Sequence, residues 1–282
     1  MPKKIVIVTK PIVENPKPTE PKFDKFFSNT SLGVRTNNSS KIKQIIKFIS
    51  TVIDNVNFEF YPEGIKIRSM SLSHISLIDI LIPKELFSTY NCGDGFVRGI
   101  NVKYFSQILN HLKNEDELVL SFESNCDKMD IYFINSKYNK LYELSLMDID
   151  SEDLDISGLG EMVELSIDSK YFNEIIHDFN DIGEQIRFKI LKDKEKISLK
   201  TDGSFTSLKM ILHDDEDITY RNLQDIELFF DIEIMTLFTK CYNLNKKIII
   251  IIGHNVPIEL KYTLFETGYI RYFIAPKIEE DN

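Results

Sequence analysis

The sequence predicts an α+β protein made of two similar halves, each with two helices packed on antiparallel sheets. Two observations predict this fold class. A unit of one amphipathic helix followed by two short strands occurs four times along the chain. The second and third helices also share the pattern Lys-Tyr-Phe-x-x-Ile followed by another apolar residue, at positions 103–109 and 170–176. A pattern that returns in both halves is typical of an internally repeated chain.

The first unit begins with a helix expected over residues 39–55, where isoleucine and valine recur at helical spacing. Two strands are expected to follow, at residues 57–61 and 65–69. The Pro62-Glu63-Gly64 segment between them is typical of a hairpin turn, because proline and glycine favour tight turns.

The helices and strands of the other three units are predicted from the same apolar spacing. The second helix is expected to start at Asn101, the third includes the repeat at 170–176, and the fourth is expected over residues 231–244. The strands expected after these three helices lie at residues 117–123, 129–134, 185–191, 196–200, 247–252 and 257–262.

Composition marks two segments that do not fit these units. Five of the nine prolines fall in the first 21 residues together with several lysines, which is typical of an extended or disordered tail. Residues 135–161 separate the halves, and in their second part aspartate and glutamate surround a few apolar residues, as in an inter-domain linker. The predicted order is a tail at 1–30, a first domain at 31–146, a linker at 147–161 and a second domain at 162–282.

Cysteine usage and hydropathy predict an intracellular protein. The 3 cysteines are far apart and form no C-x-x-C pair, so neither a disulfide framework nor a zinc ribbon is expected. The apolar run at residues 5–8 is too short for a signal-peptide core, and the run at 248–252 is far too short for a membrane span.

No motif predicts catalysis, a metal site or a cofactor. Neither phosphate-binding glycine pattern occurs, and the 5 histidines form no H-x-x-x-H pair. Asp148-x-Asp150-x-Glu152 has the opening spacing of an EF-hand, but Asp153 stands where that loop needs glycine. One enzymatic alternative stays open, a metal-dependent hydrolase that uses the carboxylates of Asp214, Asp215 and Asp217.

The net charge of −10 hides an uneven distribution. Residues 1–120 carry 16 basic and 12 acidic groups, whereas residues 121–282 carry 18 and 32. The first, second and fourth helices have an excess of lysine, which would form a continuous surface for phosphate groups if the helices lie side by side. These helices carry no arginine, so readout of base edges by arginine is not expected.

Five separated segments support a family resemblance. They are residues 68–77 (RSMSLSHISL), 99–102 (GINV), 114–116 (NED), 146–150 (LMDID) and 268–279 (GYIRYFIAPKIE). Together they resemble the proliferating cell nuclear antigen (PCNA) family of DNA sliding clamps, over residues 31–282. The resemblance implies a DNA-clamp fold that assembles into a homotrimeric ring around duplex DNA, with helices lining the hole. Such a ring acts as a non-enzymatic processivity factor for DNA polymerase.

The resemblance also implies which residues face DNA. These are Lys41, Lys43, Lys47, Lys103, Lys113, Lys170, His177, Lys240, Lys246 and Lys247. The third helix departs from the family pattern, because Glu174, Asp178 and Asp181 outnumber its two basic residues.

A pocket for partner peptides is implied on the outer face, beneath the linker. Its residues would be Met70, His74, Ile75, Leu77, Leu154, Ile156, Pro257, Phe273, Ala275, Pro276 and Ile278. Most are apolar, as an anchor pocket requires, although core packing alone would also explain apolar side chains. Ring closure would pair the strand at 140–146 of one subunit with the strand at 205–212 of the next. Lys192 falls in a loop that resembles the acceptor of ubiquitin-like modifiers.

The partners implied by the family are duplex DNA without sequence preference, further copies of the chain, a DNA polymerase, a clamp loader of the replication factor C type, and flap endonuclease and DNA ligase clients. The protein would act in a nucleus or at another site of DNA replication. The alternative in the same class is a monomeric or dimeric processivity factor that holds DNA by charge alone.

Overall fold

The computed structural model describes residues 30–93, 95–123, 126–150, 154, 162–194 and 196–277. It confirms the predicted α+β class: two similar halves, each with two α-helices packed on antiparallel sheets. The tail predicted at residues 1–30 lies outside the described residues, except for Thr30.

The first half contains α1, α2 and nine strands. In chain order its elements are β1 (Thr30–Thr36), α1 (Ser39–Val52), β2 (Asn55–Tyr61), β3 (Gly64–Met70), β4 (Ser76–Pro83), the 3-10 turn η2 (Lys84–Leu86), β5 (Thr89–Cys92), β6 (Phe96–Asn101), α2 (Val102–Leu109), β7 (Glu117–Glu123), β8 (Lys128–Ile134) and β9 (Asn139–Met147).

The second half repeats this order with α3 and α4. Its elements are β10 (Val163–Asp168), α3 (Ser169–Asn180), β11 (Gln185–Leu191), η3 (Lys192–Lys194), β12 (Lys196–Asp202), β13 (Ser207–Leu212), β14 (Ile218–Arg221), β15 (Ile226–Asp231), α4 (Ile232–Thr239), η4 (Tyr242–Leu244), β16 (Lys247–Ile252), β17 (Ile258–Leu264) and β18 (Gly268–Ile274).

Several predicted boundaries were wrong. The fourth helix ends at Thr239, because Lys240 caps it and η4 follows as a separate turn whose buried Leu244 keeps the apolar spacing. The first helix ends at Val52, since Ile53 is extended and β2 begins at Asn55. The broad boundary region at 135–161 contains the regular strand β9. The prediction of two strands after each helix was also too low. Between α1 and α2 the structure has β4, β5 and β6 in addition to the two predicted strands.

Three helices start at side-chain caps that the sequence places at equivalent positions. The side chains of Asn101, Asp168 and Asp231 accept hydrogen bonds from backbone N–H groups in the first turns of α2, α3 and α4. Such caps satisfy N–H groups that have no partner within the helix. Each cap is the last residue of a strand, so it fixes where that strand turns into the helix.

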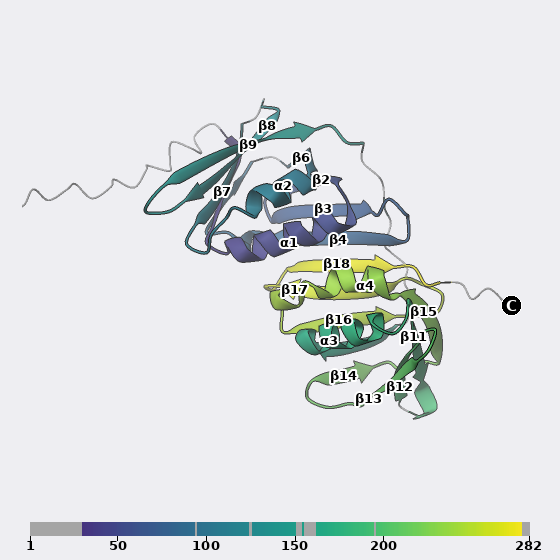
Figure 1. The fold of residues 1–282 in the computed structure, drawn as a ribbon. Helices are drawn as coiled ribbons and strands as arrows, with labels where there is room; N and C mark the ends of the chain where they lie inside the picture. The colour runs from purple at the N-terminus through teal and green to yellow at the C-terminus, as the bar shows by residue number, and fades with distance from the viewer. Residues whose placement is uncertain are drawn as a thin grey trace, which may run out of the picture.

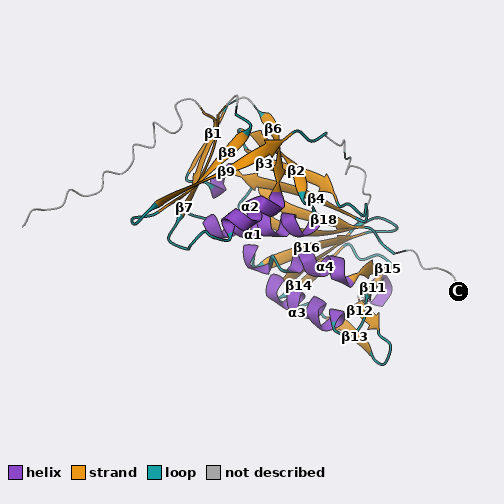
Figure 2. Ribbon diagram, turned by 45° about the horizontal axis from the view of Figure 1, so that its top comes forward, coloured by secondary structure: helices purple, strands orange, loops and turns teal. Residues whose placement is uncertain are grey.

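The strand order is the same in both halves. The series β5-β1-β7-β8-β9 corresponds to β14-β10-β16-β17-β18, and β6-β2-β3-β4 corresponds to β15-β11-β12-β13. Strand β18 of the second half pairs with β4 of the first, with Tyr272 opposite Ile78, so one continuous sheet joins the halves. The four helices lie along one side of this sheet (Figure 1), and the view in Figure 2 shows the same arrangement.

An aromatic cluster fills the junction between the halves on the helix side. The ring of Phe48 on α1 lies 5.4 Å from Phe238 on α4 and 5.5 Å from Tyr272 on β18, both edge to face. Phe238 also stacks on Tyr262 of β17 at 4.7 Å. Aromatic pairs at these distances add to the stabilisation from burial, so the helices of the two halves are packed firmly against each other.

Besides β5, β14 and β15, which stand at ends of the sheets, β9 and β13 have open edges within the described residues. Strand β9 pairs with β8 and touches β6 only at Leu146 and Met147, which leaves its edge over residues 139–145 open. Strand β13 pairs with β12 alone. These two edges lie at opposite ends of the molecule (Figure 1).

Candidate functional sites

The solvent side of α1 carries two lysines at adjacent turns. Ile42, Ile45, Ile46 and Ile49 face the sheet, so Lys43 and Lys47 are left on the opposite side of the helix. The ammonium of Lys43 donates to the carbonyl of Asn110 at the end of α2, at 3.4 Å.

Lys41 points elsewhere. Its Nζ lies 5.2 Å from the ring centroid of Phe265, in the turn between β17 and β18 of the other half. A cation over an aromatic face is held in place, so Lys41 helps to join the halves as well as contributing charge.

The other lysines of the predicted set lie on or near α2 and α4. Lys103 is exposed in the first turn of α2, and Lys240 is exposed at the end of α4. Lys113 follows α2, with its Nζ 5.7 Å from the ring of Tyr138. Within the described residues, the ammonium groups of Lys47, Lys103, Lys240 and Lys246 make no hydrogen bond or ion pair with protein. Lys247 donates to the carbonyl of Glu216 at 3.1 Å.

Helix α3 differs because its two basic residues are paired with acids of the same helix. Lys170 lies 3.7 Å from Glu174, and His177 lies 3.6 Å from Asp181. Each pair has the i, i+4 spacing that brings side chains together on a helix surface. Asp178 is also exposed and adds negative charge. The basic surface therefore runs over α1, α2 and α4, and it does not continue over α3.

The predicted partner pocket gathers residues from three separate stretches on the other side of the sheet. The first stretch is the β3–β4 connection, where His74 has a φ of 58° and its Nδ1 lies 3.1 Å from Sδ of Met70. This tight turn leaves Ile75 42% exposed, so an apolar side chain is presented to solvent. Leu77 is the second residue of β4 and is half-buried.

The second stretch is the end of β18 with the start of β17. Phe273 pairs directly with Leu77 across the junction between the halves. The backbone N–H of Ala275 donates to the carbonyl of Ile75 at 2.9 Å, which extends the pairing beyond the strand. Pro257 and Pro276 are half-buried beside this end.

The third stretch is the linker, and of its two predicted pocket residues the structure describes Leu154. The carbonyl of Leu154 accepts a hydrogen bond from Nη1 of Arg68 at 2.9 Å. Ile156 and Ile278, also predicted for the pocket, lie outside the described residues.

A group of charged residues lies next to the pocket and was missed by sequence reasoning. Asp79 of β4 is fully buried, and its carboxylate accepts from Arg68 Nε at 3.1 Å and from Arg271 Nη1 at 3.2 Å. Arg271 also makes a two-bond pair with the buried carboxylate of Glu259, at 2.7 and 3.0 Å. Burial disfavours the charged guanidinium, but the bonds to Glu259 and the nearby Asp79 outweigh this and raise the pKa of Arg271. The single charged residue in each of the otherwise largely apolar strands β4 and β18 was the available signal.

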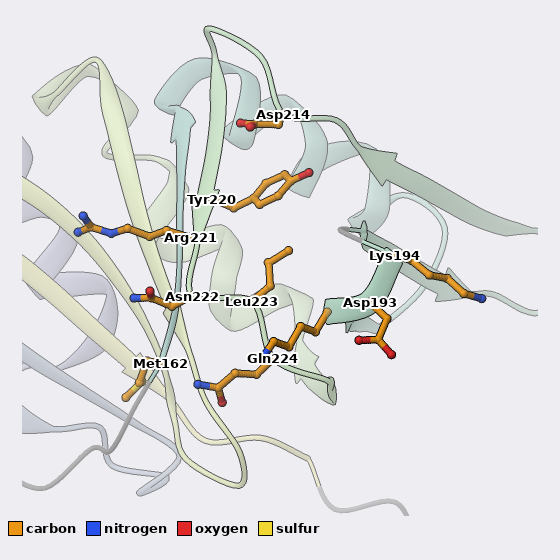
Figure 3. A pocket seen from close by; sticks show the side chains of 10 residues that line it. Met162, Asp193, Lys194, Asp214, Tyr220, Arg221, Asn222, Leu223 and Gln224 are labelled. Carbon is orange, nitrogen blue, oxygen red and sulfur yellow. The ribbon is translucent and has the colours of Figure 1, made fainter.

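A separate hollow of about 1100 Å³ lies on the second half, between η3 and the end of β14. Figure 3 shows Tyr220 and Leu223 pointing toward η3, while Arg221 and Asn222 point to the other side of the strand. Lys192 of the predicted modification loop lines this hollow and is exposed.

The aspartates of the hydrolase hypothesis form a turn rather than a metal site. Asp214 lines the edge of the same hollow. Oδ1 of Asp215 accepts the backbone N–H groups of Asp217 and Ile218, both at 2.8 Å, which is the geometry of a side-chain-closed turn. No cluster of three or more metal-ligating side chains occurs in the part of the chain that the structure describes.

The fold and these surfaces are those of one class of protein, a two-domain DNA clamp, with basic helices on one side of a continuous sheet and the residues of the predicted pocket on the other. A family model described as "Proliferating cell nuclear antigen, N-terminal domain" matches residues 31–154, and the corresponding C-terminal domain model matches residues 160–277. The proliferating cell nuclear antigen of Chaetomium thermophilum is 28% identical over 257 residues, which cover 89% of this chain and 99% of that protein.

The chain therefore belongs to the proliferating cell nuclear antigen family. This family consists of sliding clamps, the processivity factors of DNA replication, and its members are not enzymes. They associate with DNA, with further copies of themselves and with replication and repair proteins. The hydrolase hypothesis is therefore wrong. Among the described residues, no helix is long and apolar enough to cross a membrane.

Proposed function

We propose that three copies of this chain close into a ring around duplex DNA and tether replication and repair proteins through the outer-face pocket. In this proposal the first domain spans residues 31–146, the linker 147–161 and the second domain 162–282. The ring acts in a nucleus or at another site of DNA replication, and its clients include a DNA polymerase, a clamp loader of the replication factor C type, a flap endonuclease and a DNA ligase.

The observation that carries the proposal is the joint between β4 and β18. Strand β18 is the last strand of its half, and it pairs with β4 of the other half. The corresponding strands of the two halves are β9 and β13, and both have open edges. A second copy of the internal joint, formed between β9 of one chain and β13 of the next, leaves neither edge open. Head-to-tail contacts of this kind produce rings when the rotation closes.

The internal joint also supplies a register for the contact between subunits. Tyr142 of β9 corresponds to Tyr272 of β18, since each pairs with the core residue of the preceding strand, Ile131 or Leu260. Leu208 of β13 corresponds to Ile78 of β4, because they pair with Thr201 and Ser69, each two residues after the residue, Leu199 or Ile67, that pairs with Phe188 or Phe58. Because Tyr272 lies opposite Ile78, Tyr142 of one subunit lies opposite Leu208 of the next.

The basic side of the helices supports DNA as the occupant of the hole. The ammonium groups of Lys47, Lys103 and Lys240, which have no hydrogen-bond or ion-pair partner among the described residues, provide contacts to phosphates that do not depend on sequence, together with Lys43 and Lys113. Weak contacts are sufficient, because a closed ring cannot leave a circular duplex sideways. Lys170 and His177 contribute little in this proposal, since each is paired with an acid on α3.

The test combines oligomeric mass with retention on DNA. We expect a mass of three chains by light scattering at micromolar concentration, and slow loss of the loaded protein from circular DNA with rapid loss after the circle is cut. A monomer or dimer that leaves circular and linear DNA at the same rate would support the charge-only alternative and contradict the ring.

A further inference from the structure

The charged residues beside the partner pocket form one row across four strands. In the β-ladder, Arg68 of β3 lies opposite Asp79 of β4, which lies opposite Arg271 of β18, which lies opposite Lys261 of β17. Two residues further along each strand, the next row on the same face is Met70, Leu77, Phe273 and Glu259. Met70, Leu77 and Phe273 of this second row are predicted pocket residues. The charged row lies directly beside them and therefore forms one wall of the pocket.

The hydrogen bonds of Arg68, Asp79 and Arg271 join three parts of the chain that form the predicted pocket: the β3–β4 region, the linker and β18. Arg68 holds Asp79 through Nε at 3.1 Å and the linker carbonyl of Leu154 through Nη1 at 2.9 Å. Asp79 in turn holds Arg271 of the other half. The Arg271 guanidinium lies 4.7 Å from the ring centroid of Phe273, so its position also fixes one face of that pocket residue.

Arginine is suited to this role because its guanidinium presents several N–H donors in a fixed plane. One side chain can therefore bind a carboxylate and a carbonyl at once. The network is neutral overall, with two guanidinium groups and the carboxylates of Asp79 and Glu259. Burial raises the pKa of the neighbouring Tyr269, and the negative charge of Asp79 raises it further.

We propose that Arg68 is a positioning residue for partner binding: it holds the linker against the sheet at Leu154, and through Asp79 it ties the linker to Arg271 and Phe273 of the second half. This inference rests on the proposed role of the pocket. Arg68 itself does not need to contact the partner peptide. The linker wall and the β18 wall of the pocket are set by one shared network that crosses the domain junction.

The test measures binding of a labelled synthetic peptide by fluorescence anisotropy, together with the melting temperature of the free protein. The peptide carries a PIP box, the short motif with aromatic anchors that is typical of partners of this family. In Arg68→Gln the charge and the forked donors are lost, and we expect the peptide to bind about tenfold more weakly, mainly through faster dissociation. In Arg68→Lys the charge that balances Asp79 is kept, but one compact ammonium cannot hold both acceptors. We therefore expect a near-native melting temperature with the same loss of affinity.

Arg98→Gln is the matched control, because Arg98 lies on the same half and its guanidinium contacts near neighbours of its own strand, with a hydrogen bond to the carbonyl of Val97 and the ring centroid of Phe96 at 5.6 Å. The control should bind the peptide normally. Normal affinity in both Arg68 variants would overturn the inference. So would full recovery of affinity in Arg68→Lys, since charge balance alone would then explain the residue. If the wild-type protein fails to bind the peptide, the proposed pocket function itself is wrong.

Discussion

Asp116 shows how a single buried carboxylate can organise a connection between elements. Its Oδ2 accepts the backbone N–H of Lys113 at 3.0 Å, and the hydroxyl of Tyr138 donates to both carboxylate oxygens, at 3.0 and 3.2 Å. The side chain of Asn135 donates to Oδ1 as well. Asp116 thus joins the turn after α2 to the turn between β8 and β9.

These contacts determine how Asp116 titrates. Burial disfavours its charged form, but the hydrogen bonds from Lys113, Asn135 and Tyr138 outweigh burial and lower the pKa of the carboxyl group below its ordinary value. A carboxyl group whose pKa is lower in the folded state stabilises the fold above its unfolded pKa. This contribution is lost as the pH falls through the folded pKa.

We predict that Asp116→Asn destabilises the protein by about 2 kcal/mol at neutral pH, because donors that bind a charged acceptor lose most of their stabilisation. The difference in unfolding free energy between wild type and variant should shrink below about pH 4, where the wild-type carboxyl group also becomes protonated. Urea denaturation at several pH values measures both effects. A difference that stays constant down to the lowest pH would show that the charge of Asp116 is not involved.

At the scale of elements, the four helices are alike in their packing and unlike in their charge. Each buries an apolar face against the sheet. On α1, the ammonium of Lys47 makes no hydrogen bond or ion pair with any residue that the structure describes, so it can meet a phosphate, whereas Lys170 on α3 lies 3.7 Å from Glu174. We infer that duplex DNA in the ring is held by α1, α2 and α4 and passes α3 with little attraction.

We predict that Lys47→Glu weakens binding of a short labelled duplex much more than Lys170→Glu, which is its matched control on α3. Each phosphate contact that is lost lowers the slope of log affinity against log salt by about one, and the trimer carries three copies of the substitution. Lys47→Glu should therefore reduce the slope by about three, and Lys170→Glu by less than one. Anisotropy titrations over a range of salt concentrations measure this. Equal slopes for the two variants would contradict the asymmetry.

The elements themselves were largely predictable from local pattern, because a strand with one buried face alternates visibly in sequence. The strands at 117–123, 185–191 and 247–252 have the predicted bounds. Register between distant strands is not local, so the pairing of β4 with β18 could not be derived from the pattern of either strand. The network of Arg68, Asp79 and Arg271 depends on that pairing, and for this reason it was not foreseen.

The candidate site was predictable in part for the same reason. The helix lysines were identified by position along the chain, but the contact of Lys41 with Phe265 depends on how the two halves meet. The pocket residues were assigned by family resemblance, and their roles remain predictions. The lack of net positive charge on the α3 surface was visible in the sequence. Glu174 and Asp181 stand four residues after Lys170 and His177, a spacing that brings such side chains together on a regular helix.

At the scale of the whole molecule, the repeated joint makes a specific prediction about the contact between subunits. With Tyr142 opposite Leu208, the exposed Leu141 and Glu143 of β9 lie on the same face as Lys209 and Ile211 of β13. Glu143 is then a diagonal neighbour of Lys209, a spacing that long side chains can bridge. Opposite charges at this position favour closure, and like charges oppose it.

We predict that Glu143→Lys and Lys209→Glu each weaken the trimer, and that the double variant recovers much of the loss. Each pair contributes roughly 0.2–1 kcal/mol, and three joints act together in a closed ring. The concentration at which the trimer dissociates, measured by light scattering during dilution, should therefore rise in both single variants and fall back in the double variant.

Two features keep this test specific to the joint. Glu143 also lies 3.4 Å from Lys128 within its own chain, so the effect of Glu143→Lys alone includes the loss of that exposed pair. Only the coupling between the two substitutions reports contact across the joint. Lys196→Glu is the matched control, because Lys196 lies on β12 rather than on the open edge and should leave the trimer unchanged. A double variant as weak as the sum of the single variants would show that β9 and β13 do not meet in the register of the internal joint.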